Sequence, residues 1–135
     1  MDYANTITLD LPYDQAVPKV KEAFKEQGFG ILTEIDVRAT LKDKLGQDME
    51  DYVILGACNP QLAHRALDIE RAIGLLLPCN VVVRTTEDDK TLVQALDPKV
   101  MVTVPERPEV QPVAEEADTR IQAALDALAH RPGQD

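Results

Sequence analysis

YVILGACNPQLAHRALDIERAIGLLLPCNVVV, residues 52–83, is the stretch that decides the predicted fold. It holds both cysteines of the chain, each beside an asparagine and a proline in mirrored order: Cys58-Asn59-Pro60 and Pro78-Cys79-Asn80. Residues 52–57 would be apolar on both faces of a strand, which is typical of a strand in the interior of a sheet. Pro60 then starts a helix at the position that proline favours, with Asn59 as its N-cap.

The two cysteines are predicted to meet in space. If the strand over 52–57 pairs antiparallel with a strand over 75–85, the end of the first lies beside the start of the second. Cys58 would also stand at the positive end of the helix, which favours a lowered thiol pKa. The thiols could then be a redox pair, or soft ligands for a metal ion with His64 as the third. The alternative is that both cysteines are small, inert hydrophobic residues.

Outward from this stretch, apolar periodicity predicts further elements. Strands are expected over residues 6–9, 29–37 and 91–96, and helices over 12–27, 38–45 and 113–130. Asp14 is the expected N-cap of the first helix, and Gly28 and Gly46 are expected to end the first and second helices. The proline-rich residues 97–111 are expected to connect the last strand to the last helix. The resulting order, β-α-β-α-β-α-β-β-α, indicates an α+β fold. We expect one domain over 1–135, with a core over about 3–129 and a frayed tail over 130–135.

A second candidate site lies on the predicted strand over 29–37. Alternation places Ile31, Thr33 and Ile35 on one face, and Glu34 with Asp36 on the other. Two carboxylates on one face could act as an acid/base pair or bind a cation, although such spacing is also typical of a solvated face. In an antiparallel sheet, Glu34 and Asp36 would lie at the opposite end of the neighbouring strand from Cys58. A parallel crossover through the second helix would instead bring Glu34, Asp36 and both cysteines together, so the sheet topology decides between one composite site and two separate ones.

Composition excludes several functions. The chain has 24 acidic and 14 basic residues and a net charge of −10, which argues against binding to nucleic acid or to anionic membranes. There is no signal-peptide pattern or apolar run of membrane-spanning length, so a cytoplasmic, reduced protein is expected. The chain has no serine, which excludes a serine triad. No complete catalytic set is visible, and no cofactor is predicted.

Several motifs together resemble the family named domain of unknown function 302. They are Gly28-Phe29-Gly30, Glu34-Ile35-Asp36, Leu41-Lys42, Lys44-Leu45-Gly46, Ile54 to Pro60, Ala63 and Gly74 to Asn80. The resemblance covers roughly residues 6–128. It implies a bacterial or archaeal α+β domain with a curved, mainly antiparallel sheet of about five strands, helices packed on it, and a layout similar to TATA-binding-protein-like folds. It also implies a homodimer, but no established reaction, cofactor or substrate.

The leading hypothesis is a non-enzymatic module that binds a small-molecule ligand or a protein. Its site is the rim formed by Cys58, Asn59, Pro60, Pro78, Cys79 and Asn80, where turn-forming polar residues flank two thiols. The rival hypothesis is a redox or metal-dependent enzyme with Cys58 as nucleophile and Cys79 as its resolving partner. A third is a structural subunit with buried, inert thiols.

Overall fold

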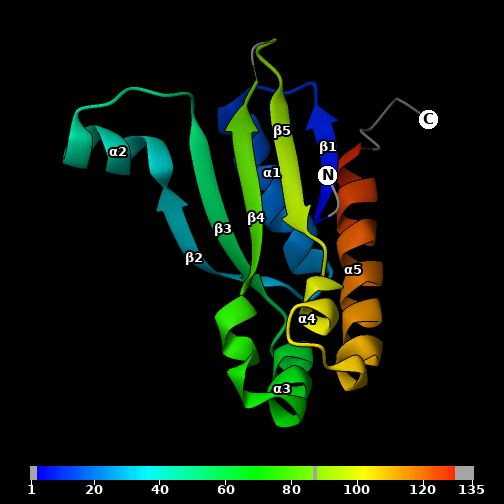
Figure 1. Cartoon of the computed structure of the whole chain (residues 1–135). Helices are drawn as coiled ribbons and strands as arrows, with labels where there is room; N and C mark the ends of the chain where they lie inside the picture. The colour runs from blue at the N-terminus through cyan, green and yellow to red at the C-terminus, as the bar shows by residue number, and fades with distance from the viewer. Residues whose placement is uncertain (1–2, 87, 130–135) are drawn as a thin grey trace.

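The computed structural model describes residues 3–86 and 88–129. Within them, the centre of the molecule is an antiparallel sheet with the strand order β1-β5-β4-β3-β2 (Figure 1). The strands are β1 (Ala4–Leu9), β2 (Gly30–Asp36), β3 (Tyr52–Cys58), β4 (Cys79–Thr85) and β5 (Thr91–Leu96). The predicted α+β class and antiparallel five-stranded sheet are confirmed. The tail predicted to fray, 130–135, lies outside the described residues.

Two helices cover one face of this sheet, α1 (Tyr13–Glu26) and α5 (Gln111–Ala129). Their apolar stripes pack on the inward side chains of the central strands, because alternation along a strand sends every second residue to this face. The main core contains Val20, Phe24, Leu55, Val81, Val83, Val93, Ile121 and Leu125. Each of the two helices therefore buries one apolar face against the sheet. The expected N-cap of α1 was wrong: Pro12 holds that position, and Asp14 lies in the first turn.

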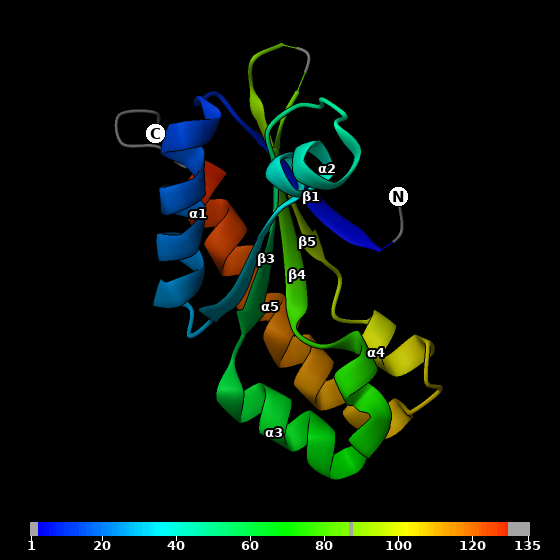
Figure 2. The ribbon, with the colours of Figure 1, turned by 90° about the vertical axis from the view of Figure 1, so that its left-hand side faces the viewer.

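A smaller group of helices closes one end of the sheet (Figure 2). It contains α3 (Pro60–Ile69), the 3-10 helix η1 (Arg71–Leu76), α4 (Val100–Thr103) and the 3-10 helix η2 (Pro108–Val110). A second core cluster fills this end: Leu62, Ala66, Ile73, Met101, Val110, Val113, Ala114 and Ala117. Arg107 ties the connection before α5 to α3, since its Nη2 donates to the backbone oxygen of Ile69 at 2.6 Å.

Two segment predictions change at this end of the molecule. The strand expected over 75–85 begins only at Cys79, and residues 71–76 form η1 instead. Pro78 has no N–H for the strand ladder, and Ile73 is buried in the second cluster, so both favour the helical turn. The proline-rich connection is also partly helical, because it contains α4 and η2.

A β-bulge changes the faces of β2. The register with β3 shifts between Ile31, opposite Ala57, and Thr33, opposite Gly56. The extra residue sends Ile31 to the face covered by helices, whereas Thr33 and Ile35 point to the other face. The prediction that Ile31, Thr33 and Ile35 share a face was therefore wrong.

The helix α2 (Val37–Leu45) stands apart from α1 and α5 (Figure 2). The Asp36 side chain caps it by accepting from the backbone N–H of Ala39 at 2.9 Å. Gly46, with φ of 67°, ends it in the left-handed conformation as predicted. None of its described residues is buried, so α2 adds little to the core.

Candidate functional site

The two cysteines line one cavity at the end of β3 and the start of β4. The pairing of these strands sets Ala57 opposite Cys79, which brings the next residue, Cys58, to the same corner of the sheet. Apolar side chains from the loop after α1 and from α3, α4 and α5 form the walls. They include Phe29, Leu62, Ala66, Met101, Val113 and Ala117. Cys58 and Cys79 thus lie at one corner of the sheet as backbone positions.

The cavity is small. Its volume is about 20 Å³, enough for one water-sized occupant, since a single water needs roughly 10–15 Å³ on this measure. Organic ligands of drug size occupy about 300–1,000 Å³. An occupant of this cavity is therefore an ion or a molecule of very few atoms.

Both cysteines are free thiols, but they differ in exposure. Cys58 is partly exposed, whereas Cys79 is buried with 8% of its surface accessible. Burial raises the pKa of the Cys58 thiol, and burial together with the charge of Cys58 raises the pKa of Cys79 to about 11. The expected lowering of the Cys58 pKa was wrong, because removal from water favours the neutral thiol. Burial thus shifts both thiols toward the neutral form.

Asn59 fixes the backbone between Cys58 and α3. Its Oδ1 accepts the backbone N–H of Leu62 at 3.2 Å, so Asn59 is the N-cap, and Pro60 occupies the first helical position. Both roles were predicted from the sequence. Asn59 is buried at the cavity wall, so its hydrogen bond positions Cys58 directly before the helix.

The remaining residues of the predicted rim point elsewhere. Successive strand residues alternate between faces, so Pro78 and Asn80 lie on the opposite face from Cys79. A Cβ atom added to Gly56 would lie 2.8 Å from Pro78 Cγ on that face. Asn80 is exposed and borders a depression there with Tyr52 and Gln94. The structure thus divides the predicted rim: Cys58, Asn59 and Cys79 are among the residues that line the cavity, whereas Pro60, Pro78 and Asn80 are not.

His64, the third candidate metal ligand, does not reach the cysteines. Its side chain is 77% exposed and pairs with Asp68 on the outer side of α3 at 3.7 Å. Among the residues that the structure describes, no three or more His, Cys, Asp or Glu side chains form a group able to hold a metal ion.

Glu34 and Asp36 form a separate corner. Asp36 is paired with Val53 near the start of β3, whereas Cys58 at its end is paired with Gly30. At about 3.3 Å per residue, roughly 17 Å of strand separates the two corners. Glu34 pairs with Lys21 at 2.7 Å, and Asp36 caps α2. Burial and the nearby carboxylates, with Asp36 first among them, raise the pKa of Tyr13 to about 12. The two carboxylates thus have structural partners.

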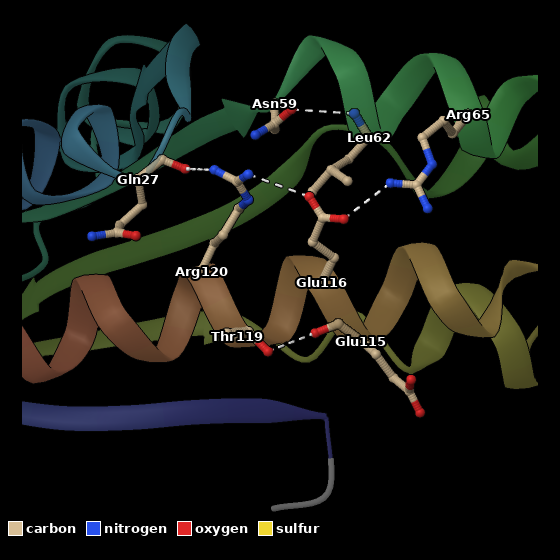
Figure 3. A network of polar contacts seen from close by, with 8 residues as sticks. All are labelled: Gln27, Asn59, Leu62, Arg65, Glu115, Glu116, Thr119 and Arg120. Atoms are coloured by element: carbon tan, nitrogen blue, oxygen red, sulfur yellow. Dashed lines mark hydrogen bonds and ion pairs between the residues drawn. The ribbon is translucent and has the colours of Figure 1, made fainter.

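An ion-pair network borders the cavity and was missed in the sequence (Figure 3). Glu116 of α5 accepts from Arg65 of α3 at 3.1 Å and from Arg120 at 3.3 Å. Arg120 also donates to the backbone oxygen of Gln27 at 3.2 Å. The network holds the end of α1, α3 and α5 together beside Asn59. The i, i+4 spacing of Glu116 and Arg120 was the only available signal.

The face of the sheet away from α1 and α5 was also missed. Its side chains alternate with the core residues and are Ala4, Thr6, Thr8, Thr33, Ile35, Tyr52, Ile54, Asn80, Val82, Arg84, Leu92, Gln94 and Leu96. We call these side chains the open face. No strand residue that the structure describes contributes a carboxylate to it, although the chain has 24. Its single charge, Arg84, lies 3.9 Å from Glu50.

The described helices include none with the length and apolar character needed to span a bilayer.

Comparisons with known proteins agree with the fold. The family model described as Domain of unknown function DUF302 matches residues 5–128. The crystal structure of an uncharacterized conserved protein DUF302 from Bacillus stearothermophilus is similar, with a TM-score of 0.87 and 29% identity. That match covers 95% of this chain and 99% of the other. No curated protein matches the chain.

Proposed function

The chain belongs to the DUF302 family, whose name assigns no activity, and we propose from the site itself that it is a non-enzymatic binding module with its site at the Cys58–Cys79 cavity. One observation carries this proposal: two cysteines with free thiols, from different strands, are among the residues that line one mostly apolar cavity, and Cys58 is partly exposed. Burial raises the pKa of both thiols, which disfavours the thiolate that nucleophilic catalysis needs.

The volume of the cavity limits the ligand class. Only an ion or a molecule of very few atoms fits, so the proposed ligand is much smaller than the small molecule expected from the sequence. Sulfur atoms and apolar walls favour soft, polarisable ligands over hard, oxygen-seeking ones.

Thermal denaturation with a panel of small probes tests this function. The panel contains Cu⁺, Ag⁺, Zn²⁺, Mg²⁺, cyanide and sulfite, each in excess over protein. A ligand that binds only the folded state raises the melting temperature. We expect at least one probe to stabilise the wild-type protein but not Cys58→Ala or Cys79→Ala. The matched control His64→Ala, on the exposed side of α3, should respond like wild type. Equal shifts in all four proteins would refute the proposal.

A second candidate function, protein interaction, is favoured by the open face. This face presents partly exposed apolar side chains, and Ile35 alone is 48% exposed. A depression of about 240 Å³ lies between Tyr3, Tyr52, Asn80 and Leu96. An antiparallel sheet can leave one face in water, but that face is then usually polar.

The occupant that fits the open face is a second copy of this chain. With a net charge of −10, two copies repel each other, and this repulsion is weakest where the approaching surfaces carry no carboxylates. A two-fold axis would place the open face, whose strand side chains include no carboxylate, against itself. Nucleic acid is disfavoured there, because Arg84 is the one cation among these strand side chains and it has Glu50 beside it.

A further inference from the structure

Two hydrogen-bond donors from different helices converge beside Gly28, where the chain leaves α1. A Cβ atom added to Gly28 would lie 2.9 Å from Asn59 Nδ2 and 3.4 Å from Arg120 Nη1. One donor therefore comes from the cap of α3 and the other from α5. Neither Gly28 nor Arg120 lines the Cys58–Cys79 cavity, so this group of donors goes beyond the function proposed above.

Asn59 supplies a donor that the protein itself does not use. Its Oδ1 accepts the backbone N–H of Leu62, which fixes the orientation of the amide. The amide nitrogen points away from Leu62, toward the side where Arg120 lies (Figure 3). Among the residues that the structure describes, none accepts a hydrogen bond from this nitrogen, although only 9% of Asn59 is exposed. A largely buried donor without an acceptor costs free energy, which favours a ligand that accepts.

Arg120 supplies a second donor and a positive charge. Its guanidinium has five N–H groups, and its contacts with the Gln27 backbone oxygen and with Glu116 leave others available. Its side chain is 38% exposed. Arg65 also pairs with Glu116, so two cations share one carboxylate and the network keeps a positive charge. The amino end of α3, a helix of 10 residues, adds partial positive charge on the same side.

We propose that Asn59 Nδ2 and Arg120 bind one small oxyanion beside Gly28. Two oxygens of a phosphate, a sulfate or a carboxylate accept from the two nitrogens, and no covalent bond forms. Glycine suits this position for two reasons. Its φ of 87° is left-handed, and a side chain would occupy the space next to both donors. Gly28 is exposed, so the anion reaches the site directly from solvent.

Titration with inorganic phosphate at constant ionic strength, followed by ¹H–¹⁵N NMR, tests the proposal. We expect saturable shifts of the Asn59 side-chain amide and of the Gly28 backbone amide. Asn59→Asp keeps an oxygen that can cap α3 but removes the donor, and Arg120→Gln removes the charge. Each should weaken phosphate binding about tenfold or more, because hydrogen bonds to charged groups are the strong ones. Arg84→Gln, which removes an arginine on the other face of the sheet, should bind like wild type.

A parallel titration with acetate identifies the class of anion. Saturation by acetate at the same concentrations would assign the site to carboxylates as well as phosphates, whereas saturation by phosphate alone would assign it to phosphates. Wild-type protein that shows no saturation with either anion, or binding that survives both Asn59→Asp and Arg120→Gln, would overturn the proposal. Arg120→Gln keeps the test informative if Asn59→Asp fails to fold.

The anion site and the Cys58–Cys79 cavity can fail separately. Cys58→Ala should bind phosphate like wild type, since no sulfur takes part. Loss of phosphate binding in Arg120→Gln should leave any cysteine-dependent thermal shift in place. If phosphate and acetate do not bind but a probe of the cavity does, the oxyanion site falls and the proposed function stands.

Discussion

Cys58 and Cys79 line one cavity although they belong to different strands, and they differ in their access to water. Antiparallel pairing of β3 with β4 produces this arrangement, since Ala57 lies opposite Cys79 and Cys58 follows Ala57. Cys58 is partly exposed, whereas Cys79 is buried. Their reactivity should show the same order.

Thiol alkylation should be slow at neutral pH and should accelerate as pH rises. The thiolate is the reactive form, and the pKa of Cys79 is raised to about 11 and that of Cys58 is also raised. Below each pKa, the rate should therefore grow about tenfold per pH unit. Mass spectrometry after iodoacetamide treatment measures both sites, with Cys58 modified first. If folded Cys58 reacted faster at pH 7 than it does in denaturant, the redox-enzyme hypothesis would be favoured instead.

Asn59→Ala should destabilise the protein by about 1–2 kcal/mol, because a buried N-cap of α3 loses its bond to the Leu62 N–H. Asp36→Ala is the matched control. It removes the exposed N-cap of α2, a helix with no described residue buried, so it should cost less than about 0.5 kcal/mol of global stability. Urea denaturation compares the two variants. Equal losses would show that the cap beside the cavity has no special structural role.

Gly56→Ala should be destabilising, because a Cβ atom here would meet the Thr33 side chain and Pro78 Cγ. Overpacking of this kind costs about 1–3 kcal/mol. Thr33→Ala in the same chain should recover part of the loss. Gly30→Ala is the control within the sheet, since nothing lies within 4 Å of its added Cβ. Calorimetric melting measures the stability of these variants. If Gly56→Ala were as stable as Gly30→Ala, the packing around Gly56 described above would be contradicted.

Val82→Asp should convert a dimer to monomers. Val82 lies on β4 in the middle of the open face, and a two-fold interface would bring the new carboxylates near each other. Like charges placed together in an interface cost several kcal/mol, so the dissociation constant of the dimer should rise at least ~100-fold. Gln94→Glu, an isosteric change on the same face, should also weaken the dimer. Sedimentation equilibrium provides the measurement.

Gln15→Asp is the charge-matched control for that experiment. Gln15 is exposed on α1, the helix that covers the opposite face of the sheet. It should leave the dimer intact. A wild-type protein that sediments as a monomer, or a Gln15→Asp variant that dissociates like Val82→Asp, would remove the open face as an interface.

Much of the fold could be predicted because local patterns agree with it. The apolar alternation of β3, the Asn59-Pro60 helix start and the glycines that end α1 and α2 each have a local physical cause. The strand boundary at Cys79 could not be predicted in the same way. The apolar residues before Cys79 are compatible with either a strand or a short helix, and burial of Ile73 in the second core cluster favours the helix.

The candidate site was only partly predictable for similar reasons. Convergence of the cysteines follows from strand direction, which the chain order implies. The separation of Asn80 from Cys79 follows from alternation, which adjacency in sequence obscures. The direction of the Cys58 pKa shift depends on burial by residues from α3, α4 and α5, and sequence spacing does not reveal these contacts.

We propose that Cys58 and Cys79 together bind one ligand in one cavity. A crystal of the protein soaked with mercuric chloride tests it most directly, because Hg²⁺ binds two thiolates when both are within reach. We predict one mercury peak in the anomalous map, bonded to both sulfurs. Separate peaks on the two cysteines, or a peak on Cys58 alone, would contradict the account.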